Sequence, residues 1–219
     1  MKKPLIGITP ALEGGKYTLF CNYCEMVERA GGIPVILPCG FDAIHVLHGI
    51  LFSGGCDLSP ETSGCEASPL IKGVTPERDA FESQIFNQAM TAGLPILGIC
   101  RGHQLINALL GGTTIRDISE AGYAEQHNRG TELGPHPVAT VPGTLLCSLI
   151  GDYKEVWSTH HQAVKSPGRG LVINAYSPEG IVEGIEHESG RILGVQTHPE
   201  RMDMLEPFEW LIELAAERM

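Results

Sequence analysis

The chain has 219 residues, of which 42% are hydrophobic, and carries a formal net charge of -11. This length and composition fit a soluble globular protein that buries a substantial core without stabilising cross-links, and the negative charge argues against nucleic acid or an anionic membrane as a main partner. No stretch approaches the ~18 apolar residues of a membrane-spanning helix, and seven cysteines without a secretion signal favour reduced thiols and a cytoplasmic location.

Short apolar runs alternate with helix-like segments through the first half of the chain. The predicted strands cover residues 5–9, 33–37, 50–53 and 95–99, and the predicted helices cover residues 17–30, 41–47, 77–91 and 101–110. Residues 56–75 form a long loop, and loops of that length often carry function. The alternation of strand and helix predicts a parallel sheet with right-handed crossovers.

The second half is richer in strands. They are predicted over residues 137–141, 155–159, 171–177, 181–187 and 192–197, and a final helix over residues 204–218. Residues 177–180 have the composition of a hairpin turn between two of these strands. Because no repeat or linker interrupts the chain, we expect residues 1–219 to form a single α/β domain.

The segment from Gly98 to Gln104 has the spacing G-x-C-x-G around Cys100. This is the form of a nucleophile elbow, a sharp strand-to-helix turn that exposes the nucleophile, here with cysteine in place of serine. Glycines at 98 and 102 allow close approach of the backbones, and a helix N-terminus favours the thiolate. A buried cysteine at the end of a strand is the alternative interpretation.

A second motif, from Gly194 to Glu200, is an apolar strand that ends in His-Pro-Glu. His198 beside a cysteine serves as general base and then as acid to the leaving amine. Glu200, two residues on along extended backbone, holds the imidazole in the required tautomer. The alternative is a surface histidine followed by a turn proline.

The two motifs, about a hundred residues apart, together resemble a class I glutamine amidotransferase domain. Four further segments resemble the peptidase C26 group, and its γ-glutamyl-γ-aminobutyrate hydrolases are the nearest match. These segments are residues 75–82, 136–138, 158–164 and 175–186. The resemblance implies a flavodoxin-like α/β fold, in which helices cover both faces of a mostly parallel central sheet beside a smaller antiparallel section.

The resemblance also implies a catalytic triad of Cys100, His198 and Glu200. The Cys100 thiolate attacks the γ-carbonyl of a small γ-glutamyl substrate, His198 steered by Glu200 protonates the departing amine, and water hydrolyses the γ-glutamyl thioester. We expect this chemistry to need no metal and no organic cofactor.

An oxyanion site is expected from Gly54 or Gly55, which lie where the family has its oxyanion glycines, together with the N–H of Arg101. The chain departs from the family pattern at two positions. Arg101 stands where many amidotransferases carry an apolar residue, and Thr197 stands where an aromatic residue is common. The second departure leaves the shape of the leaving-group pocket open.

Three further residues are candidates for substrate binding. Gln104 lies where the superfamily contacts the glutamyl group, although a glutamine packed against the sheet is an equal alternative. Arg78, beside Asp79, offers a charge near the long loop, against the alternative of an exposed helix ion pair. His161 ends a strand near the expected site, and the alternative is a packing or hydrogen-bonding role.

No metal site is predicted. Cys21 and Cys24 form a C-x-x-C pair, but no second ligand pair follows at a suitable spacing, so two packing residues on a helix are favoured. The nine histidines show no H-E-x-x-H arrangement. Cys56 and Cys65 share the long loop, without support for a redox role.

The main alternative function is the glutaminase subunit of an amidotransferase, which delivers ammonia to a synthase on a separate chain. A different class is a catalytically silent binding relative, which the intact Cys100, His198 and Glu200 argue against. The leaving amine stays open, since γ-aminobutyrate, another polyamine product, a folate polyglutamate or a peptide would need different linings of residues 56–75. The oligomeric state is also open, with a homodimer the commonest arrangement.

Overall fold

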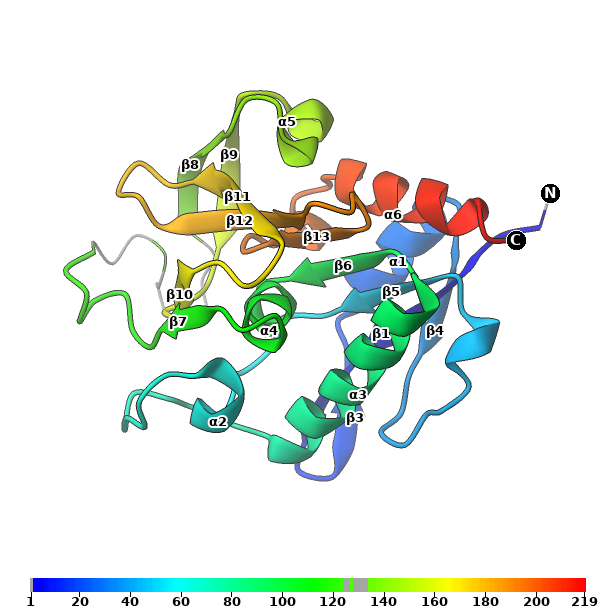
Figure 1. Cartoon of the computed structure of the whole chain (residues 1–219), viewed down its shortest axis with the longest axis horizontal. Helices are drawn as coiled ribbons and strands as arrows, with labels where there is room; N and C mark the ends of the chain where they lie inside the picture. The colour runs from blue at the N-terminus through cyan, green and yellow to red at the C-terminus, as the bar shows by residue number, and fades with distance from the viewer. Residues whose placement is uncertain (1, 124–126, 128–133) are drawn as a thin grey trace.

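The computed structural model describes residues 2–123, 127 and 134–219. Five parallel strands form one half of an eleven-stranded sheet, in the order β4-β1-β5-β6-β13 (Figure 1). They are β4 (Ile33–Ile36), β1 (Leu5–Thr9), β5 (Gly49–Phe52), β6 (Ile96–Ile99) and β13 (Ile192–Val195). Because parallel strands end at the same edge, the segments that follow β5, β6 and β13 meet there.

The other half of the sheet is antiparallel. Next to β13 come β12 (Val182–His187), β11 (Leu171–Tyr176), β8 (Gly134–Thr140) and β9 (Tyr153–Ser158), and β10 (Ala163–Ser166) pairs with both β12 and β7 (Thr113–Ile115). A short helix, α5 (Leu145–Ile150), joins β8 to β9. The strands predicted in this half are found, whereas β7, β10 and α5 were not predicted.

Helices cover both faces of the parallel half. On one face lie α1 (Cys21–Arg29) and α6 (Glu206–Ala216), and on the other lie α3 (Pro76–Ala92) and α4 (Arg101–Leu109) (Figure 1). Alternate residues of each strand pack against opposite helix layers, because successive side chains of a strand point to opposite faces of the sheet.

The central strand β5 shows this alternation. Leu51 packs in the core with α1 and α6, whereas its neighbours Ile50 and Phe52 pack in the core with α3 and α4. All three side chains are fully buried, as is typical of a strand covered on both sides. The α/β class, the helices on both faces and the antiparallel section are therefore confirmed.

The first predicted helix, over residues 17–30, was wrong at its beginning. The preceding residues instead form a hairpin of β2 (Ala11–Glu13) and β3 (Lys16–Thr18), and α1 begins only after it. Gly14 and Gly15 adopt φ of 54° and 75° in the turn. Two consecutive residues with positive φ suit the tight turns that join hairpin strands, and glycine reaches them without strain.

Other boundaries also differ from the sequence prediction. Residues 41–47 contain only a 3-10 turn, η1 (Ile44–Val46), and the loop at residues 56–75 contains α2 (Pro60–Ser63). The final helix begins two residues later than predicted, at Glu206. Among the described residues, no helix combines the length and apolarity that crossing a membrane requires.

Candidate active site

Cys100 occupies the turn between β6 and α4, where its backbone adopts φ 53° and ψ -105°. Few residues other than glycine tolerate positive φ, so this conformation stores strain, as active-site turns often do. Glycine is required at both flanking positions, because a side chain there would collide with the backbone. A Cβ on Gly98 would lie 2.6 Å from the carbonyl oxygen of Gly102, and one on Gly102 would collide with the carbonyl oxygen of Phe52. The turn therefore has the geometry that a nucleophile elbow needs.

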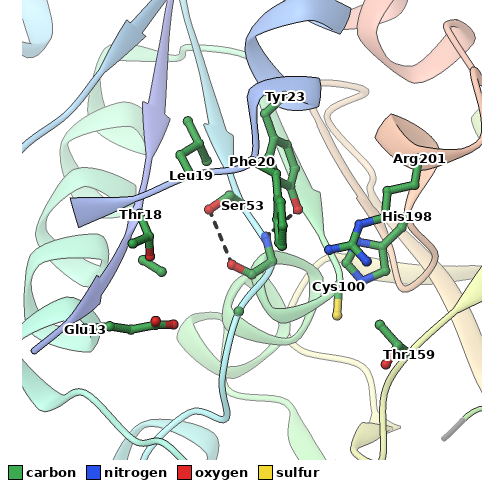
Figure 2. A pocket seen from close by; sticks show the side chains of 13 residues that line it. Glu13, Thr18, Leu19, Phe20, Tyr23, Ser53, Cys100, Thr159, His198 and Arg201 are labelled. Carbon is green, nitrogen blue, oxygen red and sulfur yellow. Dashed lines mark hydrogen bonds between the residues drawn. The ribbon is translucent and has the colours of Figure 1, made fainter. Parts of the chain in front are cut away.

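The side chain of Cys100 reaches a cavity of about 370 Å³ (Figure 2). The cavity lies between the β2–β3 hairpin with the start of α1 and the edge where β5, β6 and β13 end. Its lining comprises Ala11, Glu13, Thr18, Leu19, Phe20, Tyr23, Ser53, Gly54, Gly55, Cys100, Thr159, His198 and Arg201. Cys100 is only 6% exposed, so a substrate would reach the thiol by way of this cavity.

His198 follows β13 and faces the same cavity. Its Nδ1 lies 2.7 Å from Oε1 of Glu200, which accepts the hydrogen bond when ionised and leaves Nε2 for the cavity side. A Cβ on Gly54 would lie 3.1 Å from Cε1 of His198 and 3.6 Å from Cβ of Cys100. The imidazole, the thiol-bearing carbon and the glycine loop therefore meet at one place.

The charges at this place favour the protonated form of His198. Burial by itself lowers the pKa of His198, but the neighbouring Cys100 and the carboxylate of Glu200 outweigh burial and raise it to about 10. A histidine in this state stabilises a cysteine thiolate, which is the nucleophilic form. The three residues predicted as a triad are thus brought together, and their catalytic role stays a prediction.

Two of the three predicted oxyanion donors are available. The N–H of Gly54 donates to the hydroxyl of Tyr23 at 3.0 Å. Neither the N–H of Gly55 nor that of Arg101 has a hydrogen-bond partner among the described residues. The N–H of Arg101 belongs to the first turn of α4, where backbone donors have no partner within the helix.

Arg78 holds the segment after β5 that contains Gly54 and Gly55 in place. Its guanidinium donates to the carbonyl oxygens of Ser53 at 3.0 Å and Gly54 at 3.1 Å, and to Oε1 of Glu82 at 3.0 Å. Arg78 is 3% exposed and does not line the cavity. The alternative of an exposed helix ion pair was therefore wrong, because the sequence pattern of α3 did not reveal that this charged face is buried.

Arg101 belongs to the same buried network. Its side chain forms ion pairs with Asp79 and Glu82 of α3. Burial raises the pKa of Glu82, but the guanidinium groups of Arg101 and Arg78 outweigh it and lower that pKa overall. Arg101, the residue that departs from the family pattern, therefore has two carboxylate partners on α3.

Gln104 and His161 lie outside the lining of the cavity. Gln104 donates through Nε2 to the carbonyl oxygen of Gln162 at 3.1 Å and to Oε1 of Gln196 at 3.0 Å. His161 lies between two carboxylates, with Nε2 2.9 Å from Asp57 and Nδ1 3.1 Å from Asp117. These contacts fit the packing and hydrogen-bonding alternatives, and substrate contact by either residue stays a prediction.

Several lining residues were missed from the sequence, among them Glu13, Phe20, Tyr23 and Arg201. Most of them belong to the hairpin and the start of α1, which the mistaken helix concealed. The Gly-Gly turn was the signal that could have revealed the hairpin. Arg201 comes directly after the His-Pro-Glu motif, and its guanidinium stacks 4.4 Å from the ring centre of Phe20.

The two small cysteine patterns do not form sites in the described residues. All seven cysteines, which lie within the described ranges, are unpaired. Cys21 is exposed and Cys24 half-buried on α1. The packing interpretation of this pair fits Cys24, which contacts the core of α1 and α6, but not the exposed Cys21.

The sequence is similar to curated proteins named as glutamine amidotransferases and γ-glutamyl-γ-aminobutyrate hydrolases. The sequence is 34% identical over 235 residues to a Mycobacterium tuberculosis protein named as a glutamine amidotransferase, covering 98% of this chain and 75% of that protein. It is 30% identical over 224 residues to the γ-glutamyl-γ-aminobutyrate hydrolase of Escherichia coli K12, covering 91% of this chain and 87% of the hydrolase.

Solved structures agree on the fold. A Thermoplasma acidophilum protein described as a subunit of GMP synthase superposes with a TM-score of 0.72 at 18% identity, over 100% of this chain and 97% of that chain. A glutamine amidotransferase of Thermotoga maritima gives a TM-score of 0.63 at 15% identity, over 100% and 98% of the two chains. The sequence model of the peptidase C26 family matches residues 4–200. The chain therefore belongs to the peptidase C26 family.

Proposed function

We propose that the chain is a cysteine hydrolase that cleaves γ-glutamyl amides into glutamate and an amine. Its family and the names of its relatives support an enzyme of the hydrolase or amidotransferase kind. The observation that carries the proposal is the arrangement around the cavity. Cys100 and His198 line it together, and Nδ1 of His198 lies 2.7 Å from Glu200.

The first half-reaction transfers the γ-glutamyl group to Cys100. The thiolate forms a bond to the γ-carbonyl carbon, and the carbonyl electron pair moves to the oxygen, which accepts hydrogen bonds from the N–H groups of Gly55 and Arg101. When this pair returns, the carbon–nitrogen bond breaks. The amine leaves with the proton that His198 gives from Nε2.

The second half-reaction releases glutamate. His198, now neutral, accepts a proton from water as the water oxygen attacks the thioester carbon. The carbon–sulfur bond then breaks, and its electron pair returns to Cys100 as the thiolate. Because His198 is protonated at this point, the starting ion pair is restored.

Two charged residues of the cavity suit a γ-glutamyl group, which carries an α-carboxylate and an α-ammonium. In Figure 2, Arg201 lies beside His198, and Glu13 lies on the other side of the cavity. We assign the carboxylate to Arg201 and the ammonium to Glu13. The contact with Phe20 orients the guanidinium, and an arginine is well suited to bind a carboxylate through two hydrogen bonds.

The substrate to test first is γ-glutamyl-γ-aminobutyrate, because a relative of that name is 30% identical over 91% of this chain. The second candidate is a glutaminase subunit that works with a synthase chain. It is favoured by the structural likeness to the protein described as part of a GMP synthase. The two differ in whether the chain alone turns over a γ-glutamyl amide faster than glutamine.

The test is glutamate release by the purified chain from glutamine and from a panel of γ-glutamyl amides. We expect turnover of at least one amide well above that of glutamine, and a loss of about 1,000-fold or more in Cys100→Ala. The variant Cys21→Ala, which removes an exposed thiol, is the matched control and should keep full activity.

Arg201→Met should raise KM about 10- to 100-fold with a smaller change in kcat, whereas Arg29→Met, outside the cavity, should not raise KM.

Activity retained in Cys100→Ala would contradict the proposal. Release of glutamate from glutamine alone, with no preference for any amide, would favour the glutaminase alternative, and a search for the synthase chain by pull-down would follow.

A further inference from the structure

A second cluster of reactive side chains is buried in the antiparallel half of the molecule. It consists of His127, His160 after β9, and Glu183 on β12, which are 0%, 5% and 1% exposed. One ligand atom from each lies within 4.8 Å of the other two. None of the three residues lines the cavity that contains Cys100.

His160 presents a lone pair to this cluster. Its Nδ1 lies 2.8 Å from the carbonyl oxygen of Gln162, which can only accept, so Nδ1 carries the hydrogen. In neutral His160, Nε2 is then an acceptor, and it lies 3.6 Å from Oε1 of Glu183. An ionised carboxylate is also only an acceptor, so two acceptors face each other away from water.

His127 also faces more hydrogen-bond acceptors than it can satisfy when neutral. Its Nδ1 lies 3.2 Å from Oε1 of Glu183, and its Nε2 lies 3.6 Å from Oε2 of Glu179. A neutral imidazole has one N–H and can serve only one of these carboxylates. Within the described residues, both ring nitrogens of His127, Nε2 of His160 and both oxygens of Glu183 lack a hydrogen-bond partner.

A proton does not resolve the whole cluster. Protonated His127 can donate to Glu183 and to Glu179, but Nε2 of His160 still faces the Glu183 oxygen unless His160 is protonated as well. That state would bury two positively charged rings whose centres lie 5.0 Å apart. A protonated Glu183 can donate to one of the two histidines and leaves the other unpaired. Buried polar groups that stay unpaired each cost about 1–3 kcal/mol, and a cation that accepts all three lone pairs at once satisfies the cluster without two charged rings side by side.

We propose that His127, His160 and Glu183 bind a divalent transition-metal ion, with Zn²⁺ the best match to two imidazole nitrogens and one carboxylate. In tetrahedral zinc sites with bonds of about 2.0–2.1 Å, neighbouring ligand atoms lie about 3.3 Å apart. The two separations given above, 3.2 Å and 3.6 Å, are close to this spacing. Oε2 of Glu183, also without a partner, completes the coordination.

The surroundings of the cluster fit a metal in two further respects. A histidine that binds a metal usually donates its other N–H to a carbonyl or a carboxylate. His160 does so to Gln162, and Nε2 of His127 faces Glu179. The charges also balance, because a divalent ion is neutralised by the carboxylates of Glu183 and Glu179.

The ion has a structural role in this assignment. It joins His127 to the end of β9 and to β12, and the backbone N–H of His160 also donates to the carbonyl oxygen of His127 at 2.9 Å. Thr159, which precedes His160, lines the cavity of Cys100. The metal therefore fixes the wall of that cavity without taking part in the reaction, and the assignment does not depend on the proposed function.

The test is the metal content of the full chain, purified without a histidine tag from zinc-supplemented cultures. We expect about one Zn²⁺ per chain in the native protein, and loss of that zinc in both Glu183→Gln and His160→Ala. The matched controls are His45→Ala, which removes an exposed histidine, and Cys100→Ala, which removes the buried thiol; both should keep the zinc.

Measurements on the native chain keep the test decisive if the ligand variants do not fold. Re-addition of Zn²⁺ to chelator-treated protein should raise its Tm, and Co²⁺ should give the visible bands of tetrahedral coordination without a thiolate charge-transfer band. A native chain that takes up no Zn²⁺ would overturn the proposal, as would zinc retained in both ligand variants or lost in Cys100→Ala.

Discussion

The imidazole of His198 connects the stability of the molecule to pH. Its pKa rises from an ordinary value near 6.5 to about 10, since the effects of Cys100 and Glu200 outweigh that of burial. A raised pKa means that the folded state binds the proton more tightly than the unfolded state does. This contribution to the free energy of unfolding is complete below about pH 6.5 and disappears as pH rises through about 10.

We therefore expect the difference in the free energy of unfolding between the native chain and His198→Asn to shrink as pH rises from about 6.5 to 10. Denaturant titrations at intervals across this range would measure it. His45→Ala, which removes an exposed histidine, is the matched control for the loss of an imidazole. A difference that stays constant across this range would show that the folded chain does not bind the proton of His198 more tightly than the unfolded chain does.

Residues with local signals were the ones that the sequence identified well. Cys100 sits between two glycines at fixed spacing, and His198 and Glu200 belong to one short motif, so their proximity to a strand end could be predicted. Arg78 could not be placed in this way. Its role depends on contact with Ser53 and Gly54, which come from another part of the chain.

At the scale of the element, the conformation of the turn between β6 and α4 depends on glycine. Gly102 packs against the backbone of β5, and backbone atoms move less readily than the end of a side chain. Gly111, just beyond the other end of α4, has φ of 87° but open space around it. The two glycines therefore separate the effect of a steric collision from the effect of backbone strain.

We expect Gly102→Ala to lower the free energy of unfolding by about 3 kcal/mol and to slow alkylation of the Cys100 thiol, because the collision with Phe52 displaces the turn. Gly111→Ala should cost about 1–2 kcal/mol through strain alone and leave the alkylation rate unchanged. Denaturation midpoints and the rate of labelling by a thiol reagent would measure both effects. Equal alkylation rates in the two variants would contradict a specific role for Gly102.

The hairpin of β2 and β3 shows how an element can be mistaken. Apolar and polar residues after Tyr17 are compatible with helical periodicity, and this pattern extended the predicted helix four residues too far towards the N-terminus. The Gly14-Gly15 turn acts against that extension, since both residues adopt positive φ. Where a short apolar run fits both periods, turn chemistry was the better guide.

At the scale of the whole molecule, a buried ion network joins α3 to α4 below the site. Arg101, 3% exposed, pairs with Asp79 and Glu82, which are 4% and 0% exposed. Removing one partner of a buried pair leaves charge without compensation and costs about 3–5 kcal/mol. An exposed pair contributes much less, because water already stabilises its charges.

Arg101→Leu should therefore lower the free energy of unfolding by about 3–5 kcal/mol, even though leucine is apolar and fits a buried position. Arg116→Leu is the matched control. Arg116 pairs with Glu120 at 2.6 Å but is 36% exposed, so its loss should cost at most about 1 kcal/mol. Denaturant unfolding of the two variants gives the comparison, and similar losses would mean that Asp79 and Glu82 find other partners.

Local information in the chain was sufficient for the α/β class, for most strands and helices, and for the residues around Cys100 and His198. These features depend on hydrophobic period, on glycine and proline, and on short motifs, all of which are properties of neighbouring residues. The strand order, the hairpin wall of the cavity and the burial of Arg78 and Arg101 became clear only from the folded molecule. The meeting of His127, His160 and Glu183 belongs with them, because contacts between distant segments are set by packing and leave no period or spacing in the sequence.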